Sequence, residues 1–302
     1  MYDSIIIGCG PAGMTAALYL LRAGKKVILL ERESIGGQVA KSPRLENFPS
    51  ITSIAGEDFA SQLFDQITDL GASFEVENGM EVIKKPNGTF VVKTDFNEYE
   101  GKTVVLATGC EHKKLGLARE DELVGHGISY CAVCDGAFFA KQDVLIIGDA
   151  NTALQYAISL SDICTHVQIA TLFDHFFADE ILIERIKHIE NISYRHNLAS
   201  VEFLGENEIE GVLFEDTQTK EKVTYKASGV FICIGQQPDN ERFKGIVDLD
   251  ERGFILANDK LETKTPGVYA VGDCRQKGIR QVITATSDGA IAGVEIAKYL
   301  SR

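Results

Sequence analysis

Cys131 and Cys134 are the residues of this 302-residue chain whose types and spacing are best suited to chemistry. Two cysteines three positions apart at the start of a predicted helix can close a small disulfide ring, and a helix N-terminus lowers the pKa of a thiolate. The same pair would serve as half of a zinc site, but no second Cys-x-x-Cys motif or nearby His pair supplies the remaining ligands. The spacing therefore favours thiol–disulfide chemistry over metal binding.

The remaining cysteines occur singly in apolar or loop contexts, where each is expected to be a buried small hydrophobic residue. Seven cysteines, an odd number without the spacing of a disulfide scaffold, fit a reducing compartment. The six histidines show no metal-ligand spacing. The isolated cysteines are Cys9, Cys110, Cys164, Cys233 and Cys274.

A glycine-rich loop near the amino terminus predicts a dinucleotide site. Residues 4–7 read as a strand, residues 14–23 as an apolar-periodic helix and residues 27–30 as a second strand that ends at Glu31. Between the first strand and the helix, Gly8 permits a tight turn, Gly10 lets the backbone approach a pyrophosphate, and Gly13 lets helix and strand pack closely. The helix N-terminus offers unpaired N–H groups to the phosphates, and Glu31 can accept from ribose hydroxyls.

A second unit of the same kind begins at residue 143, with predicted strands at 144–147 and 167–170 around a helix at 154–160. Its loop, from Gly148 to Ala153, is a degraded copy of the first. Residues 267–271 form a further strand that leads to Gly272-Asp273, and a helical tail follows from about 281 to 299. The order predicts an α/β protein with two Rossmann-like, three-layer nucleotide-binding domains, the second inserted into the first.

Composition excludes several classes of partner. The 44 acidic against 30 basic residues give a net charge of −14, which argues against nucleic acid. The apolar stretches are far shorter than the roughly 20 residues of a membrane span. The amino terminus runs almost directly into a strand without the regions of a secretion signal, so we expect a cytoplasmic protein.

Several motifs follow one another along the chain: residues 8–13 with Glu31, Gly36-Gly37-Gln38, Glu46-Asn47-Phe48-Pro49, residues 103–109, Cys131-Ala132-Val133-Cys134-Asp135, Gly235-Gln236-Gln237-Pro238, and Gly272-Asp273 with Arg280-Gln281-Val282. In these motifs and their order, the chain resembles the low-molecular-weight thioredoxin reductases along essentially its whole length.

The resemblance implies a FAD-binding domain made of residues 1–112 and 243–302. Residues 116–240 are then an inserted redox-disulfide domain with a degenerate NADPH-binding fold. Asp273 is implied to bind the ribityl chain, and the backbone of Gln281 and Val282 is implied to face the flavin ring at a helix start. The implied FAD contacts are Gly8, Gly10, Pro11, Ala12, Gly13, Glu31, Gly37, Gln38, Asn47, Val82, Thr108, Gly109, Gly272, Asp273, Arg280, Gln281 and Val282.

The family also implies roles for the cysteine pair and its neighbour. Cys134 is implied to face the flavin, and Cys131 to attack the disulfide of thioredoxin. Asp135 then shuttles a proton, because reduction of a disulfide to two thiols consumes two protons. Asp135 is alternatively a helix-capping carboxylate, a role that does not exclude the first. A homodimer is implied by the family alone.

The chain departs from NADPH-using members in the inserted domain. Ala150 stands where a glycine would meet the pyrophosphate, and Asp149 puts negative charge beside the phosphates. Residues 171–173, Thr-Leu-Phe, replace a His-Arg-Arg run whose arginines would hold the 2′-phosphate. Within the family the chain is most like the ferredoxin-dependent flavin thioredoxin reductases, which implies ferredoxin as the electron donor.

Ferredoxin supplies one electron at a time and a disulfide needs two, so FAD would convert between them. Ferredoxins are usually acidic, so docking would need a local basic patch, for which the candidates are Lys25-Lys26, Lys84-Lys85, Lys113-Lys114 and Arg275 with Lys277. The alternatives are a thioredoxin reductase that uses NADH or NADPH, and a flavin-containing redox sensor without turnover. A domain rotation is expected, with hinges near residues 113–115 and 241–245.

Overall fold

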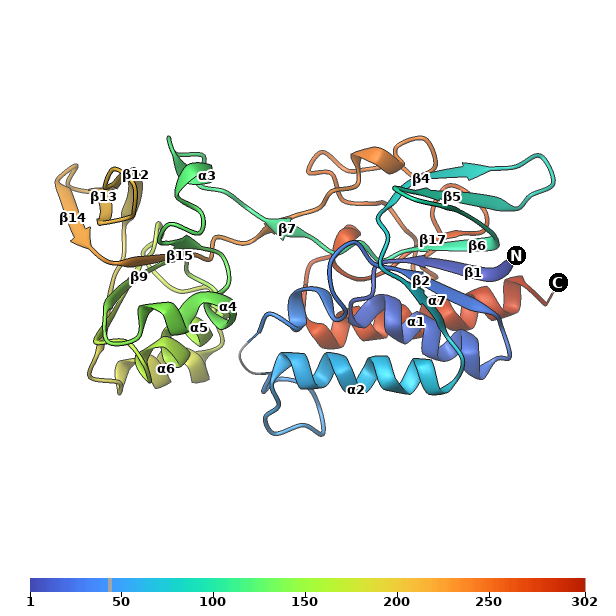
Figure 1. The fold of residues 1–302 in the computed structure, drawn as a ribbon, viewed down its shortest axis with the longest axis horizontal. Helices are drawn as coiled ribbons and strands as arrows, with labels where there is room; N and C mark the ends of the chain where they lie inside the picture. The colour runs from blue at the N-terminus through green and yellow to red at the C-terminus, as the bar shows by residue number, and fades with distance from the viewer. Residues whose placement is uncertain (43–44, 302) are drawn as a thin grey trace. The chain divides into compact units, whose positions relative to one another are not determined.

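The computed structural model describes residues 1–42 and 45–301; the side chains of Val133, Cys134 and Gln236 lie outside that description. The chain forms two compact units (Figure 1). Unit 1 comprises Met1–Glu111 and Gln237–Arg302, and unit 2 comprises His112–Gln236. The predicted α/β class, with one Rossmann-like domain inserted into another, is confirmed.

Unit 1 is built on a seven-stranded sheet in the order β3-β2-β1-β6-β5-β4, with β17 paired to the second half of β6. β3, β2, β1, β6 and β17 are parallel, whereas β4 and β5 form an antiparallel extension. The strands are β1 Tyr2–Ile7, β2 Val27–Leu30, β3 Ser73–Glu75, β4 Gly79–Lys84, β5 Phe90–Thr94, β6 Glu98–Leu106 and β17 Val268–Ala270.

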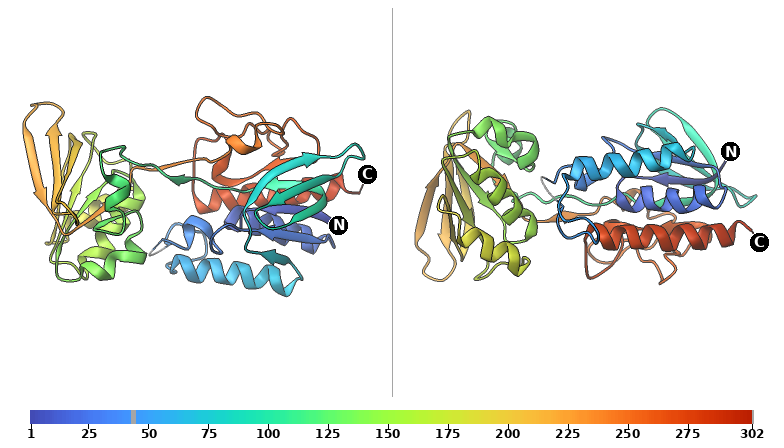
Figure 2. Two further views of the ribbon diagram at one scale, coloured as in Figure 1. Left: turned by 45° about the horizontal axis from the view of Figure 1, so that its top comes forward. Right: turned by 90° about the horizontal axis from the view of Figure 1, so that it is seen from below.

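Three helices cover one face of this sheet: α1 Pro11–Arg22, α2 Gly56–Asp69 and α7 Val282–Tyr299. α7 runs along α1 (Figure 2). Because side chains alternate along a strand, Ile6 packs under the helices while Ile5 and Ile7 pack on the opposite face against Phe243 and Ile255. Short 3-10 helices fill the connections: η1 Gly37–Val39, η3 Glu241–Phe243 and η4 Gly272–Cys274.

Unit 2 is a parallel five-stranded sheet in the order β11-β10-β9-β15-β8, with helices on one face and a small antiparallel sheet, β12-β13-β14, on the other (Figure 2). The loops after the parallel strands therefore gather at one edge. Its strands are β8 Ile128–Ser129, β9 Asp143–Ile147, β10 His166–Ala170, β11 Ile192–Arg195, β12 Leu198–Leu204, β13 Gly211–Asp216, β14 Lys222–Lys226 and β15 Gly229–Ile232. Its helices are α3 Glu120–Leu123, α4 Ala132–Asp135, η2 Gly136–Phe139, α5 Asn151–Ser161 and α6 Glu180–Lys187.

The chain crosses between the units in β7 Glu111–His112 and β16 Gln236–Gln237, which pair as a two-stranded sheet. The second crossing comes earlier than the boundary expected at residues 240–243. Asn240 is buried in unit 1, where its side chain donates to the carbonyls of Gly253 and Cys274 at 2.9 and 2.8 Å. Phe243 is buried in the unit 1 core. The segment 241–245, expected to be a hinge, is therefore a packed part of unit 1.

Among the described residues, none of the helices combines the length and the apolar character that crossing a membrane requires.

Candidate functional site

The carboxyl edge of the unit 1 sheet brings together most of the predicted cofactor residues. Gly8 follows β1, Glu31 follows β2, Thr108 follows β6 by two residues, and Gly272 follows β17 by two residues. Pro11, Ala12 and Gly13 are the first three residues of α1. Carboxyl edges of parallel sheets are where α/β proteins bind their ligands, so the position suits a cofactor site.

Gly8 and Gly10, in the first glycine-rich loop, have different structural roles. Gly8 has φ of +110°, and a Cβ on it would lie 2.2 Å from the carbonyl oxygen of Ala107, so the fold itself requires glycine. Gly10 has an ordinary φ of −82°, and the nearest atom to a Cβ there would be the Gly36 carbonyl oxygen at 3.9 Å. Packing within the protein therefore does not require a glycine at position 10. The open space beside Gly10, at the start of α1, fits a pyrophosphate.

Glu31 organises this loop from the end of β2. It is buried, and its Oε2 accepts the backbone N–H of Cys9 at 2.8 Å while Oε1 accepts that of Glu33 at 3.1 Å. A carboxylate has further lone pairs, so acceptor capacity remains for a ribose hydroxyl. Gly37, at the start of η1, faces the loop, since its Cβ would lie 3.6 Å from the Gly10 Cα. Gln38 reaches the Cys110 carbonyl at 3.5 Å.

Asp273 carries the observation that best fits a bound cofactor. Its Oδ1 is buried and has no hydrogen-bond partner among the described residues. Burial raises the pKa of Asp273, and the charges of Lys277 and Arg280 oppose that shift. A buried acceptor without a donor costs about 1–3 kcal/mol, so a ligand hydroxyl at this oxygen would relieve a real penalty. The residue fits the ribityl-binding role that the sequence predicts.

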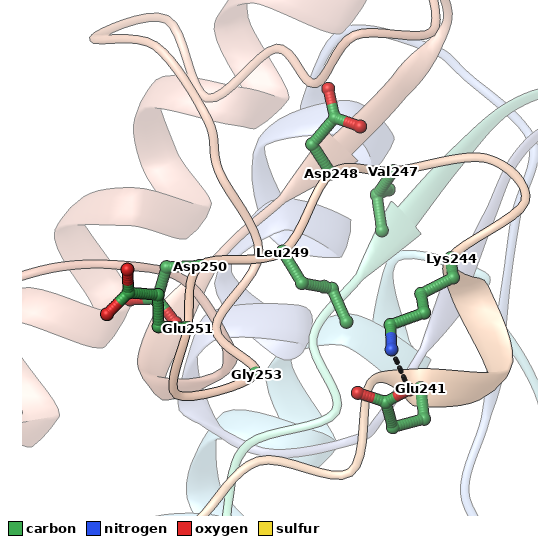
Figure 3. Close-up of a pocket in the computed structure, with 8 residues that line it drawn as sticks. All are labelled: Glu241, Lys244, Val247, Asp248, Leu249, Asp250, Glu251 and Gly253. Carbon is green, nitrogen blue, oxygen red and sulfur yellow. Dashed lines mark ion pairs between the residues drawn. The ribbon is translucent and has the colours of Figure 1, made fainter.

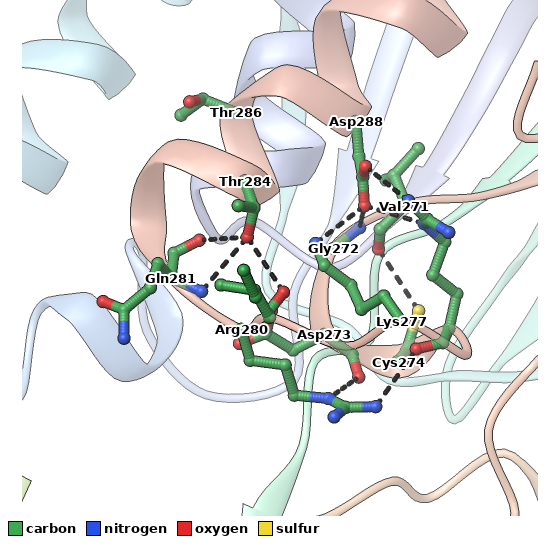
Figure 4. A network of polar contacts seen from close by, with 12 residues as sticks. Val271, Gly272, Asp273, Cys274, Lys277, Arg280, Gln281, Thr284, Thr286 and Asp288 are labelled. Atoms are coloured by element: carbon green, nitrogen blue, oxygen red, sulfur yellow. Dashed lines mark hydrogen bonds and ion pairs between the residues drawn. The ribbon is translucent and has the colours of Figure 1, made fainter. Parts of the chain in front are cut away.

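Asp288 on α7 ties the Gly272-Asp273 turn to two cations (Figure 4). Its Oδ2 accepts the Gly272 N–H at 2.9 Å and the Lys277 Nζ at 3.0 Å. Arg275 forms a bidentate pair with the same carboxylate, at 2.9 and 2.8 Å. Burial alone would raise the pKa of Asp288, but the hydrogen bonds from Arg275 and Lys277 outweigh it and lower that pKa.

This network corrects one expectation from the sequence. Arg275 and Lys277 were candidates for a docking patch, but their side chains are only 19% and 7% exposed and both are paired with Asp288. The prediction of a basic patch is wrong at this position, because the two charges are used inside unit 1.

Arg280, Gln281 and Val282 occupy the start of α7. The Arg280 guanidinium lies 3.9 Å from the centre of the Phe254 ring, and its Nε donates to the Asp273 carbonyl at 3.2 Å (Figure 4). Gln281 caps α7, and its side-chain oxygen accepts from Asn47 at 3.0 Å, which joins two predicted contacts 234 residues apart.

Val82, Thr108 and Gly109 are three further predicted FAD contacts, and they differ in the environment of their side chains and backbone. The side chain of Val82 is buried in the unit 1 core, so Val82 can serve a cofactor only through its backbone. Thr108 donates its hydroxyl to Asn240 at 3.1 Å. Gly109 adopts φ of +64° directly before Cys110.

Cys131 follows β8 at the carboxyl edge of the unit 2 sheet and is disulfide-bonded. The predicted helix after it is a single turn, α4, so the helix dipole expected to act on a thiolate is short. The side chain of Cys134 lies outside the described residues, and its role stays a prediction. Asp135 ends α4, and its Oδ2 accepts the hydroxyl of Ser129 at 2.6 Å.

The other five cysteines are free and buried. Burial raises the pKa of Cys9 to about 12, with the charge of Glu31 adding to the effect, and raises that of Cys110 to about 12. Burial also raises the pKa of Cys164, Cys233 and Cys274. Thiols with raised pKa values are poor nucleophiles at neutral pH, which agrees with a packing role.

The second glycine-rich loop resembles the first in its backbone and differs from it in its side chains. Ala150 caps α5 with φ −112° and ψ 179°, close to the conformation of Gly10 before α1. Burial raises the pKa of Asp149, while a backbone hydrogen bond and the charge of His175 oppose that shift. After β10, Thr171 is buried against His196, while Leu172 and Phe173 are about half exposed. None of these three side chains carries a positive charge that could form an ion pair with a phosphate.

A hollow of about 560 Å³ in unit 1 is lined by none of the predicted cofactor residues (Figure 3). Two of its carboxylates are paired with lysines, Glu241 with Lys244 and Asp248 with Lys264. Within the described residues, no three His, Cys, Asp or Glu side chains are grouped so that they could hold a metal ion. The hollow is lined by Glu241, Lys244, Val247, Asp248, Leu249, Asp250, Glu251 and Gly253.

Two polar residues that hold the predicted site, Asp288 and Ser129, belong to none of the sequence motifs. Asp288 was detectable as a charged residue on the small, apolar face of a helix, among Ala285, Gly289 and Ala292. Ser129 gave no such signal, because a serine before a cysteine motif is unremarkable without the hydrogen bonds that the fold reveals.

Comparison with known proteins gives consistent matches. Residues 2–289 match the family model described as pyridine nucleotide-disulphide oxidoreductase. The chain is 38% identical over 301 residues to a thioredoxin reductase of Bacillus subtilis, covering 99% of this chain and 95% of the relative. A thioredoxin reductase structure from Lactococcus lactis is 35% identical with a TM-score of 0.96, covering 100% and 99% of the two chains. A ferredoxin-flavin thioredoxin reductase structure from Clostridium acetobutylicum is 25% identical with a TM-score of 0.54, covering 99% and 98%.

Proposed function

Because the chain belongs to the pyridine nucleotide-disulphide oxidoreductases, and within them to the low-molecular-weight thioredoxin reductases, we propose that it binds FAD and passes electrons from reduced ferredoxin to thioredoxin through Cys131 and Cys134. The family and the thioredoxin reductase type follow from the matches. The donor, the substrate and the residue roles are the proposal.

The FAD site that we propose is the carboxyl edge of unit 1. Gly10 and the first N–H groups of α1 would hold the pyrophosphate, Glu31 a ribose, and Asp273 the ribityl chain. The start of α7, capped by Gln281, would face the ring. When bound, FAD supplies the conversion between one-electron donors and a two-electron disulfide.

Cys131 and Asp135 would perform the exchange with thioredoxin. Cys131 gives its proton to Asp135 and attacks the substrate disulfide as a thiolate, which forms a mixed disulfide and releases one substrate thiolate. Asp135 passes the proton to that thiolate. Attack by Cys134 on the mixed disulfide then re-forms the enzyme disulfide, and the proton that Cys134 loses passes to the departing substrate sulfur, so that two electrons and two protons reach thioredoxin.

The observation that carries the choice of donor is the second glycine-rich loop. Ala150 and Asp149 oppose a pyrophosphate, and Leu172 and Phe173 supply no cation for a 2′-phosphate. The chain is similar to the ferredoxin-flavin thioredoxin reductase structure, but it is more similar to the thioredoxin reductase structure from Lactococcus lactis, so the choice of donor depends on the loop.

An anaerobic titration of the purified holoprotein tests the proposal. We expect the flavin absorbance to stay oxidised with stoichiometric NADPH or NADH, and to bleach with reduced ferredoxin, after which thioredoxin restores it. Bleaching by stoichiometric NADPH or NADH would support a nicotinamide-dependent thioredoxin reductase, the second candidate, which the name of the matched family favours. Failure of reduced ferredoxin to support thioredoxin reduction would exclude ferredoxin as donor.

A further inference from the structure

Ser129 lies two residues before Cys131, at the end of β8, and its hydroxyl bridges the cysteine motif. The Ser129 Oγ donates to the Asp135 Oδ2 at 2.6 Å and accepts the backbone N–H of Cys131 at 2.9 Å. The Cys131 carbonyl lies 3.3 Å from the same hydroxyl. A hydroxyl has one hydrogen, so the shorter contact with a charged acceptor is the one it makes.

The position of Ser129 is set by the sheet and not by the motif. Its side chain is buried, and its Cα pairs with that of Phe231 where β8 runs parallel to β15. Asp135, in contrast, ends a helix of one turn. Among the described residues, Ser129 is the one side chain that donates to the Asp135 carboxylate. The sheet therefore orients this carboxylate through a single hydroxyl.

We propose that Ser129 is a positioning residue, which holds the Asp135 carboxylate next to Cys131 in the orientation in which Asp135 exchanges a proton with the reacting thiols. The inference rests on the proposed function, in which Cys131 gives a proton to Asp135 and a substrate thiolate takes it back. Ser129 keeps its own hydrogen throughout, so it changes the geometry and charge preference of Asp135 without entering the balance of the step.

The test compares Ser129→Ala, Asp135→Asn and the double variant of the holoenzyme, with Ser193→Ala as the matched control. Ser193 also lies on a strand of the unit 2 sheet and bonds to Gln168 and His166, but not to the cysteine motif. We expect Ser129→Ala to lower kcat for thioredoxin reduction about tenfold with little change in KM, part of the usual contribution of a general acid–base group. Ser193→Ala should stay within about twofold of wild type.

The pH profile separates positioning from a structural role. A hydroxyl donor favours the ionised carboxylate, so its loss should move the acid limb of the kcat profile to higher pH. The alkylation of Cys131 in the reduced protein, followed by mass spectrometry, should also move to higher pH in Ser129→Ala. Ser129→Thr, which keeps a hydroxyl, should restore the wild-type profile.

In the Asp135→Asn background, Ser129→Ala should have no further effect on kcat, because both act through one carboxylate. An unchanged profile in Ser129→Ala, or an equal loss in both backgrounds, would overturn the inference while leaving the roles of Cys131 and Asp135 intact. Wild-type behaviour of Asp135→Asn would instead refute the proposed proton shuttle, and the inference with it.

Discussion

Asp273 places a buried carboxylate oxygen at the carboxyl edge of unit 1 without a donor from the described protein. Gly10 leaves open space at the same edge. Neither feature stabilises the protein alone, since one removes a charged group from water and the other loosens the chain before a helix. A ligand would satisfy both features if its hydroxyl donated to the Asp273 oxygen and its phosphate filled the space beside Gly10.

Replacement of Asp273 by Asn tests this interpretation. We expect the dissociation constant of FAD to rise about 10- to 100-fold, because a charge-assisted hydrogen bond contributes roughly 1.5–3 kcal/mol. The unfolding free energy of the apoprotein should not fall, since Oδ1 has no protein donor to lose. FAD titration of the apoprotein and chemical denaturation measure the two quantities, with the exposed Asp259→Asn as control. If Asp273→Asn lowered the FAD affinity and the unfolding free energy of the apoprotein by equal amounts, Asp273 would have a structural role.

The wild-type affinity for FAD should also depend on pH in a defined direction. Burial raises the pKa of Asp273 above its ordinary value of 3.8, so on acidification the carboxylate is protonated at a higher pH than an exposed aspartate would be. FAD binding should weaken over that range in wild type and not in Asp273→Asn. An identical acid dependence in both proteins would assign the effect to another group.

Asp288→Asn should affect stability first and FAD second. The substitution leaves Arg275 and Lys277, both largely buried, without a counter-charge, which costs about 3–5 kcal/mol in comparable buried pairs. We expect a lower unfolding free energy together with weaker FAD retention, because Asp288 also accepts the Gly272 N–H. Denaturation and flavin content check both, and wild-type values of both would remove Asp288 from the site.

At the scale of elements, the chain uses one supersecondary unit twice with different residues. The loop between β1 and α1 and the loop between β9 and α5 share their backbone conformation at Gly10 and Ala150. The loops differ in their side chains, and after β10 this difference extends to Leu172 and Phe173, which are half exposed and carry no charge.

This comparison predicts that nucleotide use can be introduced locally. The triple variant Ala150→Gly, Leu172→Arg, Phe173→Arg should gain measurable NADPH binding, because it restores close backbone approach and two cations for the 2′-phosphate. Leu172 and Phe173 are exposed enough to be replaced at little cost in folding. Fluorescence titration with NADPH measures the gain, with Leu172→Gln, Phe173→Gln in the Ala150→Gly background as the uncharged control. Equal binding by both variants would mean that charge is not what the wild type lacks.

The same elements show what sequence can predict. Strands and helices around both glycine loops were expected to within a few residues, because hydrophobic periodicity and glycine spacing are local signals. The second crossing was placed too late, since Asn240 and Phe243 are fixed by contacts with residues distant in sequence. Arg275 and Lys277 were assigned to the surface for the same reason: their partner Asp288 is adjacent only in the folded chain. Hydrogen bonds and ion pairs between side chains of different elements therefore cannot be predicted from the sequence pattern alone.

For the whole molecule, the proposed ferredoxin donor, if acidic, would have to dock on a chain of net charge −14. Lys25 and Lys26 precede β2, which places them at the edge of the unit 1 sheet opposite to the predicted cofactor residues. Lys84 ends β4 in register with Phe90, which packs beside Gly267 just before β17, at that same opposite edge. Lys114 is paired with Asp121 at 2.5 Å. The lysine pairs of unit 1, Lys25-Lys26 and Lys84-Lys85, therefore offer no basic patch beside the predicted flavin edge of that unit.

This charge distribution predicts the sign of a salt effect. If ferredoxin is the donor and is acidic, the net field repels it, and salt should screen that repulsion. We expect the second-order rate constant for flavin reduction by ferredoxin to stay level or to rise up to about threefold as ionic strength increases from about 0.02 to 0.3 M, where the Debye length shrinks several-fold. Stopped-flow absorbance measures it, and an uncharged reductant serves as the control. A fall of tenfold or more would mean that a basic docking patch exists after all, and Lys113→Glu with Lys114→Glu would then show whether the first interdomain crossing provides it.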